Sequence, residues 1–200
     1  MVSKNLNVRI RSEIIKNSYL IMLNKGYKGT TINDILKETK ISKGCLYYYF
    51  KSKRDIANII IDEIIKKDFF TVWHDVYKNT NPIKSIIKKI NITYDENSYN
   101  YLSTGCPLGN LISELSSVDA KFSEKTNSIL KMWSLYIKKA INKSWNLGIL
   151  NKNLVPEEVA DFLVASIEGC ILTAKSYQDK KKLRSCFDSI INYLKLISND

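Results

Sequence analysis

A single histidine, His74, and four widely spaced cysteines leave this 200-residue chain without the usual ligands of a structural zinc site. The cysteines are Cys45, Cys106, Cys170 and Cys186, and no two of them form a C-x-x-C pair. We therefore expect no metal ion. The sequence also lacks a G-x-G-x-x-G segment and a phosphate-binding P-loop, so we expect no cofactor.

A catalytic arrangement is missing too. A thiol nucleophile needs a nearby base, and Cys106 with His74 is the one conceivable pair. Nothing in the spacing of these two residues indicates such a pair, so the sequence gives no argument for an enzyme.

Long apolar runs are absent as well. No run approaches the roughly 18 residues that a membrane-spanning helix needs. The N-terminal segment MVSKNLNVRIRSEII also lacks the apolar core of a secretion signal. We expect a protein that neither enters a membrane nor is secreted.

No segment alternates between apolar and polar residues for long enough to predict a sheet, and apolar residues recur at helical spacing. The sequence therefore predicts an all-α protein of about nine helices. The expected helices run from Val8 to Gly26, over two short stretches after Thr31 and Ser42, from Ser52 to Tyr77, from Pro82, from Gly105 to Ser116, from Phe122 to Trp145, from Pro156 and from Lys181 to Ile197. Residues 95–101, DENSYNY, are expected to form a loop.

Positive charge is concentrated at the N-terminal end of the chain. Residues 1–56 contain 12 Lys or Arg and 4 Asp or Glu, a net charge of +8, whereas the other 144 residues contain 19 and 16, a net charge of +3. A uniformly basic surface is disfavoured by that nearly neutral remainder. We place a domain boundary near Asn58, which gives domains of residues 1–57 and 58–200, and expect the first to meet a polyanion.

Three helix starts follow one another in the segment TTINDILKETKISKGCLYYYFKSKRD. Thr31, Ser42 and Ser52 each stand where a hydroxyl can cap the first turn of a helix. Two short helices joined by a tight turn form a helix-turn-helix. The second of these helices begins with Lys43 and Gly44, and a glycine there lets the backbone approach DNA closely.

The same residues carry a family resemblance. The segment from Gly26 to Ile56 closely resembles the DNA-binding domain of the TetR family of transcriptional regulators. The matching positions are Gly26, Tyr27, Thr30, Thr31, Gly44, Leu46, Tyr47, Tyr48, Tyr49, Phe50, Ser52 and Lys53. The resemblance implies an N-terminal three-helix helix-turn-helix domain followed by a helical ligand-binding and dimerisation domain.

The resemblance also implies contacts with double-stranded operator DNA. Tyr47, Tyr48, Tyr49 and Lys53 are expected to contact the DNA backbone, while Lys43, Gly44 and Cys45 approach the bases. Thr31 completes the expected DNA-binding set. One departure is Tyr49, where His is frequent in the family.

The last two helices carry broad apolar faces, and in TetR-like proteins these helices form the dimer interface. A dimer doubles the base contacts that one helix-turn-helix can make. The residues expected at this interface are Phe162, Ile167, Cys170, Phe187, Ile190 and Leu194. The alternative is that both stripes are buried inside one protomer.

Aromatic residues in the C-terminal part suggest a pocket for a small molecule. Trp73 and Tyr77 share one helical face, as do Trp133 and Tyr136. Their rings combine an apolar body with a polar edge, which suits drug-sized ligands. The alternative reading for each residue is ordinary core packing.

Cys106 suggests a second route of regulation. The segment GCPLGNLISELS resembles the start of a helix in a TetR subgroup that includes an N-ethylmaleimide-responsive repressor, and Lys175 stands at a place comparable with a lysine implicated there. A thiol at a helix start beside an ammonium group would have a lowered pKa and react with electrophiles. The alternative is that Cys106 is a small buried residue, and we favour the aromatic pocket over the thiol route.

The sequence thus predicts a cytoplasmic, homodimeric repressor that a small effector releases from its operator, with cysteines that stay reduced. A DNA-binding activator, or a regulator without a small ligand, is the alternative within DNA binding. A thiol-dependent enzyme or ligand carrier with a vestigial helix-turn-helix is the alternative from another class, and the basic N-terminal domain disfavours it.

Overall fold

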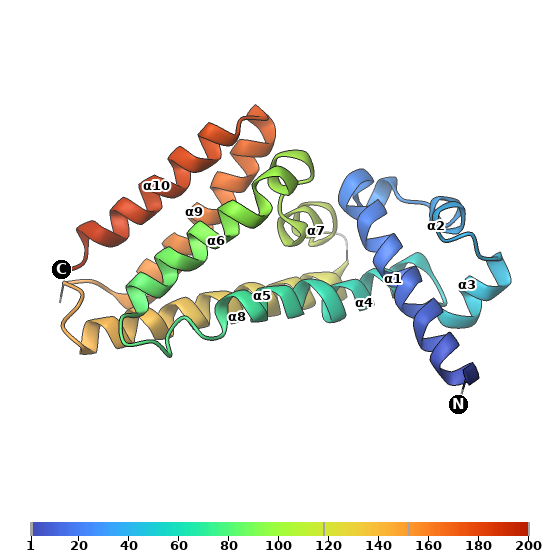
Figure 1. Cartoon of the computed structure of the whole chain (residues 1–200), viewed down its shortest axis with the longest axis horizontal. Coiled ribbons are helices and arrows are strands. Elements are labelled where there is room, and N and C mark those ends of the chain that lie inside the picture. The colour runs from blue at the N-terminus through green and yellow to red at the C-terminus, as the bar shows by residue number, and fades with distance from the viewer. Residues whose placement is uncertain (1, 118, 152, 200) are drawn as a thin grey trace. The chain divides into compact units, whose positions relative to one another are not determined.

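The computed structural model describes residues 2–117, 119–151 and 153–199, and over these residues it contains helices and no strand (Figure 1). Within these ranges the one β-type contact is an isolated bridge between Leu150 and Ser198. The predicted all-α class is confirmed. The chain clusters into two compact units, one containing the residues up to Lys67 with Asn110–Thr126, the other Asp68–Gly109 with the residues from Asn127 onwards.

The first unit contains the helix-turn-helix. Its elements are α1 (Val2–Gly29), α2 (Ile32–Thr39), α3 (Lys43–Tyr49), α4 (Lys53–Ile60) and a π-helical turn, η1 (Ile61–Ile65). The side chains of Ile14, Ile35, Leu46, Phe50 and Ile56 form a core with almost no exposed surface. The unit is larger than residues 1–57, because Asn110–Thr126 cluster with it.

Local capping places these helices where the sequence predicts them. The hydroxyls of Thr31, Ser42 and Ser52 each accept a backbone N–H three residues further along the chain. Thr31 also forms a complete capping box with Asp34. Gly26, with a φ of 76°, interrupts α1 as a C-terminal glycine does.

The second unit is built from the remaining helices. These are α5 (Lys66–Trp73), α6 (Pro82–Ser103), the start of α7 (Pro107–Leu115), most of α8 (Ala120–Asn146), α9 (Pro156–Tyr177) and α10 (Lys180–Leu196). Helices α6, α9 and α10 pack against one another (Figure 1). Helices α7 and α8 each contribute residues to both units.

Two sequence-based boundaries are wrong. Residues 95–101 lie inside α6 and do not form a loop, because DENSYNY contains neither Gly nor Pro and its one buried side chain, Ser98, is small enough to face the core. The helix expected from Ser52 to Tyr77 ends at Trp73, and η1 replaces its middle turn.

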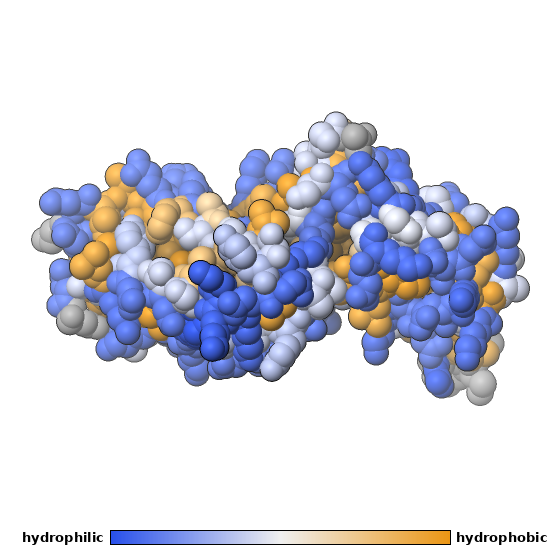
Figure 2. All heavy atoms as spheres, turned by 90° about the horizontal axis from the view of Figure 1, so that it is seen from above, coloured by the Kyte–Doolittle hydropathy of each residue, from blue (hydrophilic) through white to orange (hydrophobic). Residues whose placement is uncertain are grey.

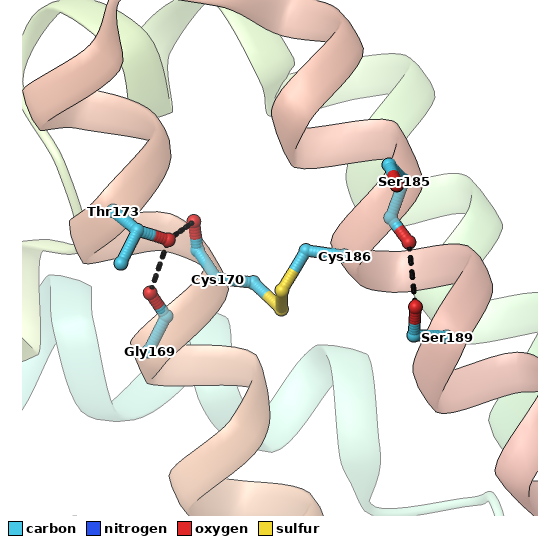
Figure 3. Close-up of a disulfide and its surroundings, with 6 residues drawn as sticks. All are labelled: Gly169, Cys170, Thr173, Ser185, Cys186 and Ser189. Atoms are coloured by element: carbon cyan, nitrogen blue, oxygen red, sulfur yellow. Dashed lines mark hydrogen bonds between the residues drawn. A yellow bond between two sulfur atoms is a disulfide. The ribbon is translucent and has the colours of Figure 1, made fainter.

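The expectation that all four cysteines are free is also wrong. Cys170 on α9 and Cys186 on α10 form a disulfide, with their Cα atoms 5.6 Å apart (Figure 3). The two residues lie on neighbouring helices, a proximity that 16 residues of sequence separation do not reveal. Cys45 and Cys106 are free.

Over the described residues, no helix is long and apolar enough to cross a membrane. On the face shown in Figure 2, hydrophobic residues form separate patches between hydrophilic ones. No group of three or more candidate metal ligands occurs within the same described residues.

Candidate nucleic-acid interface and effector site

Helix α3 presents a polar and aromatic face. The side chains of Tyr47 and Tyr48 are 44% and 75% exposed, and Lys43 and Gly44 are exposed beside them. The opposite face is anchored by Leu46, which is fully buried. Large exposed aromatic rings on a helix that the core holds in place are available to a partner surface.

Gly44 has no packing role within the chain. A Cβ atom built on it would meet only the Ser42 hydroxyl oxygen, at 4.0 Å. Its backbone is helical, so no special φ requires glycine either. The lack of a side chain on this exposed face therefore matters only to a partner that approaches the backbone. Cys45, next to it, is half-buried.

Tyr49 has a different environment from the other two tyrosines. It is half-buried, and its hydroxyl donates to the Asn7 Oδ1 atom on α1 at 3.0 Å. In the chain by itself the Tyr49 hydroxyl thus has a partner within the protein, and its contact with DNA phosphate stays a prediction.

Lys53 also lies elsewhere than expected. Its ammonium group donates to the backbone oxygens of Tyr27 and Thr30 at 2.8 and 2.7 Å, and lies 4.3 Å from the centre of the Tyr27 ring. Burial lowers the pKa of Lys53. This lysine stabilises the end of α1, and its contact with DNA phosphate stays a prediction.

Thr31 is exposed, but it too is part of the scaffold. Its hydroxyl donates to Asp34. The pKa of Asp34 is lowered mainly by a hydrogen bond from Lys25, and to a smaller extent by the hydrogen bonds from Thr31. Lys51, which is exposed between α3 and α4, was absent from the expected set of DNA-binding residues. The available signal was its place in the basic run of residues 51–54.

The expected aromatic effector residues do lie together in the second unit. The Trp73 and Trp133 rings are 5.4 Å apart, and the Tyr77 and Tyr136 rings are stacked at 6.3 Å. Phe69, which was not expected in the set, packs edge-on against Trp133 at 5.2 Å. Its spacing of four residues from Trp73 was the signal that could have placed it there.

Trp133 has an unmet hydrogen-bonding group. Its side chain is only 2% exposed, and its indole Nε1 has no hydrogen-bond partner among the described residues. A buried donor without a partner costs about 1 to 3 kcal/mol, so an acceptor that reached it would bind favourably.

Cys106 is not the activated thiol that the sequence suggests. The residue is buried, and its thiol donates to Oε1 of Glu168 on α9 at 2.9 Å. Burial, and then the charge of Glu168, raise the pKa of Cys106 well above its ordinary value. Burial likewise raises the pKa of Glu168. The ammonium of Lys175 donates to the Thr104 backbone oxygen at 3.0 Å.

The apolar stripes of α9 and α10 form the core of one protomer. Five of the six residues expected at a dimer interface are buried within the chain, namely Ile167, Cys170, Phe187, Ile190 and Leu194. Only Phe162, at 49% exposure, is accessible to a partner. The alternative reading of these five positions is therefore correct, because helices α9 and α10 bury them against each other and against α6.

A different face of these two helices is exposed. Around the disulfide it carries small residues: the exposed Thr173 and the half-buried Gly169 on α9, and the exposed Ser185 and Ser189 on α10 (Figure 3). The hydroxyls of Thr173 and Ser189 donate to backbone oxygens of their own helices, at 2.8 Å to Gly169 and 3.0 Å to Ser185. Their hydrogen bonds are thus satisfied locally, which lets a second surface cover them at little cost.

Comparison with protein families gives two matches. Residues 15–59 match the family described as bacterial regulatory proteins, tetR family, and residues 90–190 match the tetracyclin repressor-like C-terminal domain.

Two curated relatives span most of the chain. An uncharacterized HTH-type transcriptional regulator in the lacX 3' region of Lactococcus lactis is 32% identical over 184 residues, covering 89% of each chain. The HTH-type transcriptional repressor DhaR of Mycobacterium sp. strain GP1 is 25% identical over 203 residues, covering 96% of this chain and 97% of DhaR.

Solved structures have the same fold. A TetR transcriptional regulator from Chloroflexus aurantiacus superimposes with a TM-score of 0.85 at 20% identity, covering 97% of this chain and 98% of that one. The reduced form of E. coli NemR gives a TM-score of 0.81 at 18% identity, with coverages of 95% and 97%.

Proposed function

This chain belongs to the TetR family of bacterial transcriptional regulators, and on that basis we propose that it is a homodimeric repressor that a small molecule releases from operator DNA. The observation that carries the DNA-binding part is the exposed face of α3, where Gly44 leaves the backbone open between exposed Lys43 and Tyr47. Such a protein acts in the cytoplasm, where its operator is.

Two relatives support the proposal that the chain represses transcription. DhaR is described as a repressor, and IcaR of Staphylococcus aureus, which is 45% identical over 47 residues, as a negative regulator. An activator, or a regulator without a ligand, would share the same α3 face.

The proposed dimer face comprises Phe162, Gly169 and Thr173 on α9 with Ser185 and Ser189 on α10. Small residues let helices of two protomers approach closely, and Phe162 adds an exposed apolar anchor. TetR-family regulators act as dimers, and two α3 helices are needed to reach successive major grooves.

The proposed effector site is the aromatic group formed by Phe69, Trp73, Tyr77, Trp133 and Tyr136. An apolar molecule with a hydrogen-bond acceptor would satisfy the Trp133 Nε1 atom and stack against the neighbouring rings. A ligand that binds only one arrangement of the helices would shift the population away from the one that fits DNA.

Selection of bound duplexes from a random library tests the DNA-binding part. We expect an inverted repeat with half-sites about 10 base pairs apart, or a multiple of that spacing. Failure to enrich any sequence would leave the ligand-carrier alternative as the better account.

A panel of aromatic compounds with and without a carbonyl group, measured for release of the selected duplex, tests the effector part. Trp133→Phe is the matched variant, because it keeps a ring and removes the N–H donor. If no compound releases wild-type protein, the chain is a regulator without a ligand of this class.

A further inference from the structure

A one-turn segment after Gly26 is held by charged groups at both ends. The carboxylate of Glu114 accepts the backbone N–H groups of Tyr27 and Lys28, at 3.1 and 2.8 Å. The approach is so close that a Cβ atom on Gly26 would lie 2.7 Å from the Glu114 Oε1 atom. Position 26 therefore requires glycine for two reasons: its φ of 76° disfavours other residues, and a side chain there would overlap the Glu114 carboxylate.

The other end of the segment faces the ammonium of Lys53. Lys53 donates to the backbone oxygens of Tyr27 and Thr30, so a positive charge meets the carbonyl end and a negative charge meets the N–H end. Charge-assisted hydrogen bonds of this kind are shorter and stronger than neutral ones. The charge of Glu114 also opposes the lowering of the Lys53 pKa by burial, which indicates that the two groups act on one another.

This segment contacts the elements on both sides of α3. Thr31, the capping residue of α2, directly follows Thr30. Lys53 is the first residue of α4, and only Phe50, Lys51 and Ser52 separate it from the end of α3. Helix α3 is therefore joined at its N-terminal end to α2, which directly follows the segment of residues 27–30, and at its C-terminal end to α4, whose first residue donates hydrogen bonds to that segment.

We infer that Glu114 is a positioning residue for sequence-specific DNA binding: its carboxylate holds the segment of residues 27–30 so that α3 reads base edges in register. The inference rests on the proposed function, and it assigns part of the DNA-reading geometry to a residue far outside the helix-turn-helix sequence. Base contacts tolerate displacements of only about 0.5 Å, so a small shift of the segment would reduce specificity before it affected folding.

The test compares Glu114→Gln and Glu114→Ala with the control Glu124→Gln. Glu124 is exposed, lies in the same unit, and gives the same change of charge. Affinity is measured for the duplex that wild-type protein selects from a random library, and for a scrambled duplex of equal length and composition.

Electrostatics alone would make every one of these variants bind DNA more tightly, since each loses a negative charge. We expect instead that Glu114→Ala weakens binding to the selected duplex about tenfold or more. The affinity of Glu114→Gln for that duplex should lie between those of wild type and Glu114→Ala. Neither variant should bind the scrambled duplex more weakly than wild type does. A Glu114→Ala variant that binds the selected duplex as tightly as Glu124→Gln, or that loses affinity equally for both duplexes, overturns the inference.

Amide hydrogen exchange gives a readout that does not depend on DNA. The Tyr27 and Lys28 amides should exchange faster in the Glu114 variants than in Glu124→Gln, while amides in the α8 helix stay unchanged. If wild type selects no duplex, the proposed function fails, yet unchanged exchange at Tyr27 and Lys28 would separately show that Glu114 does not hold the segment.

Discussion

Cys170 and Cys186 connect α9 to α10 through a disulfide that the sequence does not suggest. Thiols in a reducing compartment are ordinarily kept reduced, so this pair is a candidate for redox-dependent bridging. The disulfide links α9 to α10, the two helices that carry the proposed dimer face.

Reduction of this disulfide should destabilise the protein. Closing a loop of about 15 residues is worth about 3 kcal/mol in the chain-entropy account. We expect the urea midpoint of wild type to fall when dithiothreitol is added, and that of a Cys170→Ala/Cys186→Ala variant to be insensitive to it. Equal midpoints with and without reductant would mean that the thiols are not bridged in solution.

Replacement of Gly44 by Ala should separate stability from DNA binding. Ala is the better helix former by up to about 1 kcal/mol, and its methyl group meets nothing closer than 4.0 Å within the chain. Thermal unfolding should therefore shift upward slightly while affinity for the selected duplex falls. Undiminished binding by Gly44→Ala would exclude close approach of DNA at this position.

A glutamate introduced on the buried face of α9 and α10 should have a different effect from one introduced on their exposed face. Ile190→Glu puts an unpaired charge into the core of one protomer, which costs several kcal/mol and should unfold the chain. Phe162→Glu changes an exposed residue, so we expect a folded monomer by sedimentation velocity and circular dichroism. A folded dimer from Phe162→Glu would place the interface elsewhere.

Cys106 should react slowly with maleimide. The thiolate is the reactive form, and burial together with Glu168 raises the Cys106 pKa, so little thiolate exists at neutral pH. Mass spectrometry of alkylated peptides should show modification of Cys45 first, and a Cys106 rate that rises as the pH approaches the raised pKa. Glu168→Gln should increase that rate. Rapid alkylation of Cys106 at neutral pH in wild type would restore the thiol-sensor interpretation.

Local chemistry explains what the sequence predicted correctly. The caps at Thr31, Ser42 and Ser52 depend on neighbours three residues away, which are visible in the sequence. The spacing of Trp133 and Tyr136, which both lie on α8, was likewise visible in the sequence. The spacing of Trp73 and Tyr77 was a poorer guide, because α5 ends at Trp73 and Tyr77 lies beyond it.

Contacts between distant parts of the chain explain what it did not predict. A stripe such as Ile167 and Cys170 shows that a surface is buried, but not whether another helix of the same protomer or a partner covers it. The basic residue Lys53 was recognised, whereas the carbonyl groups of Tyr27 and Thr30 that receive it are set by the fold.

The clustering of Asn110–Thr126 with the N-terminal helices has a consequence for how such regulators can be recombined. Asp119 forms a two-point ion pair with Arg54, and the Phe122 ring lies edge-on to Tyr27 at 5.6 Å. A chimera that took only residues 1–57 from a relative would replace Arg54 and Tyr27 but retain Asp119 and Phe122. Both contacts would then depend on whichever residues the relative has at positions 54 and 27. A graft of this unit onto another scaffold should therefore carry both stretches of sequence, so that Arg54 and Tyr27 keep Asp119 and Phe122 as their partners.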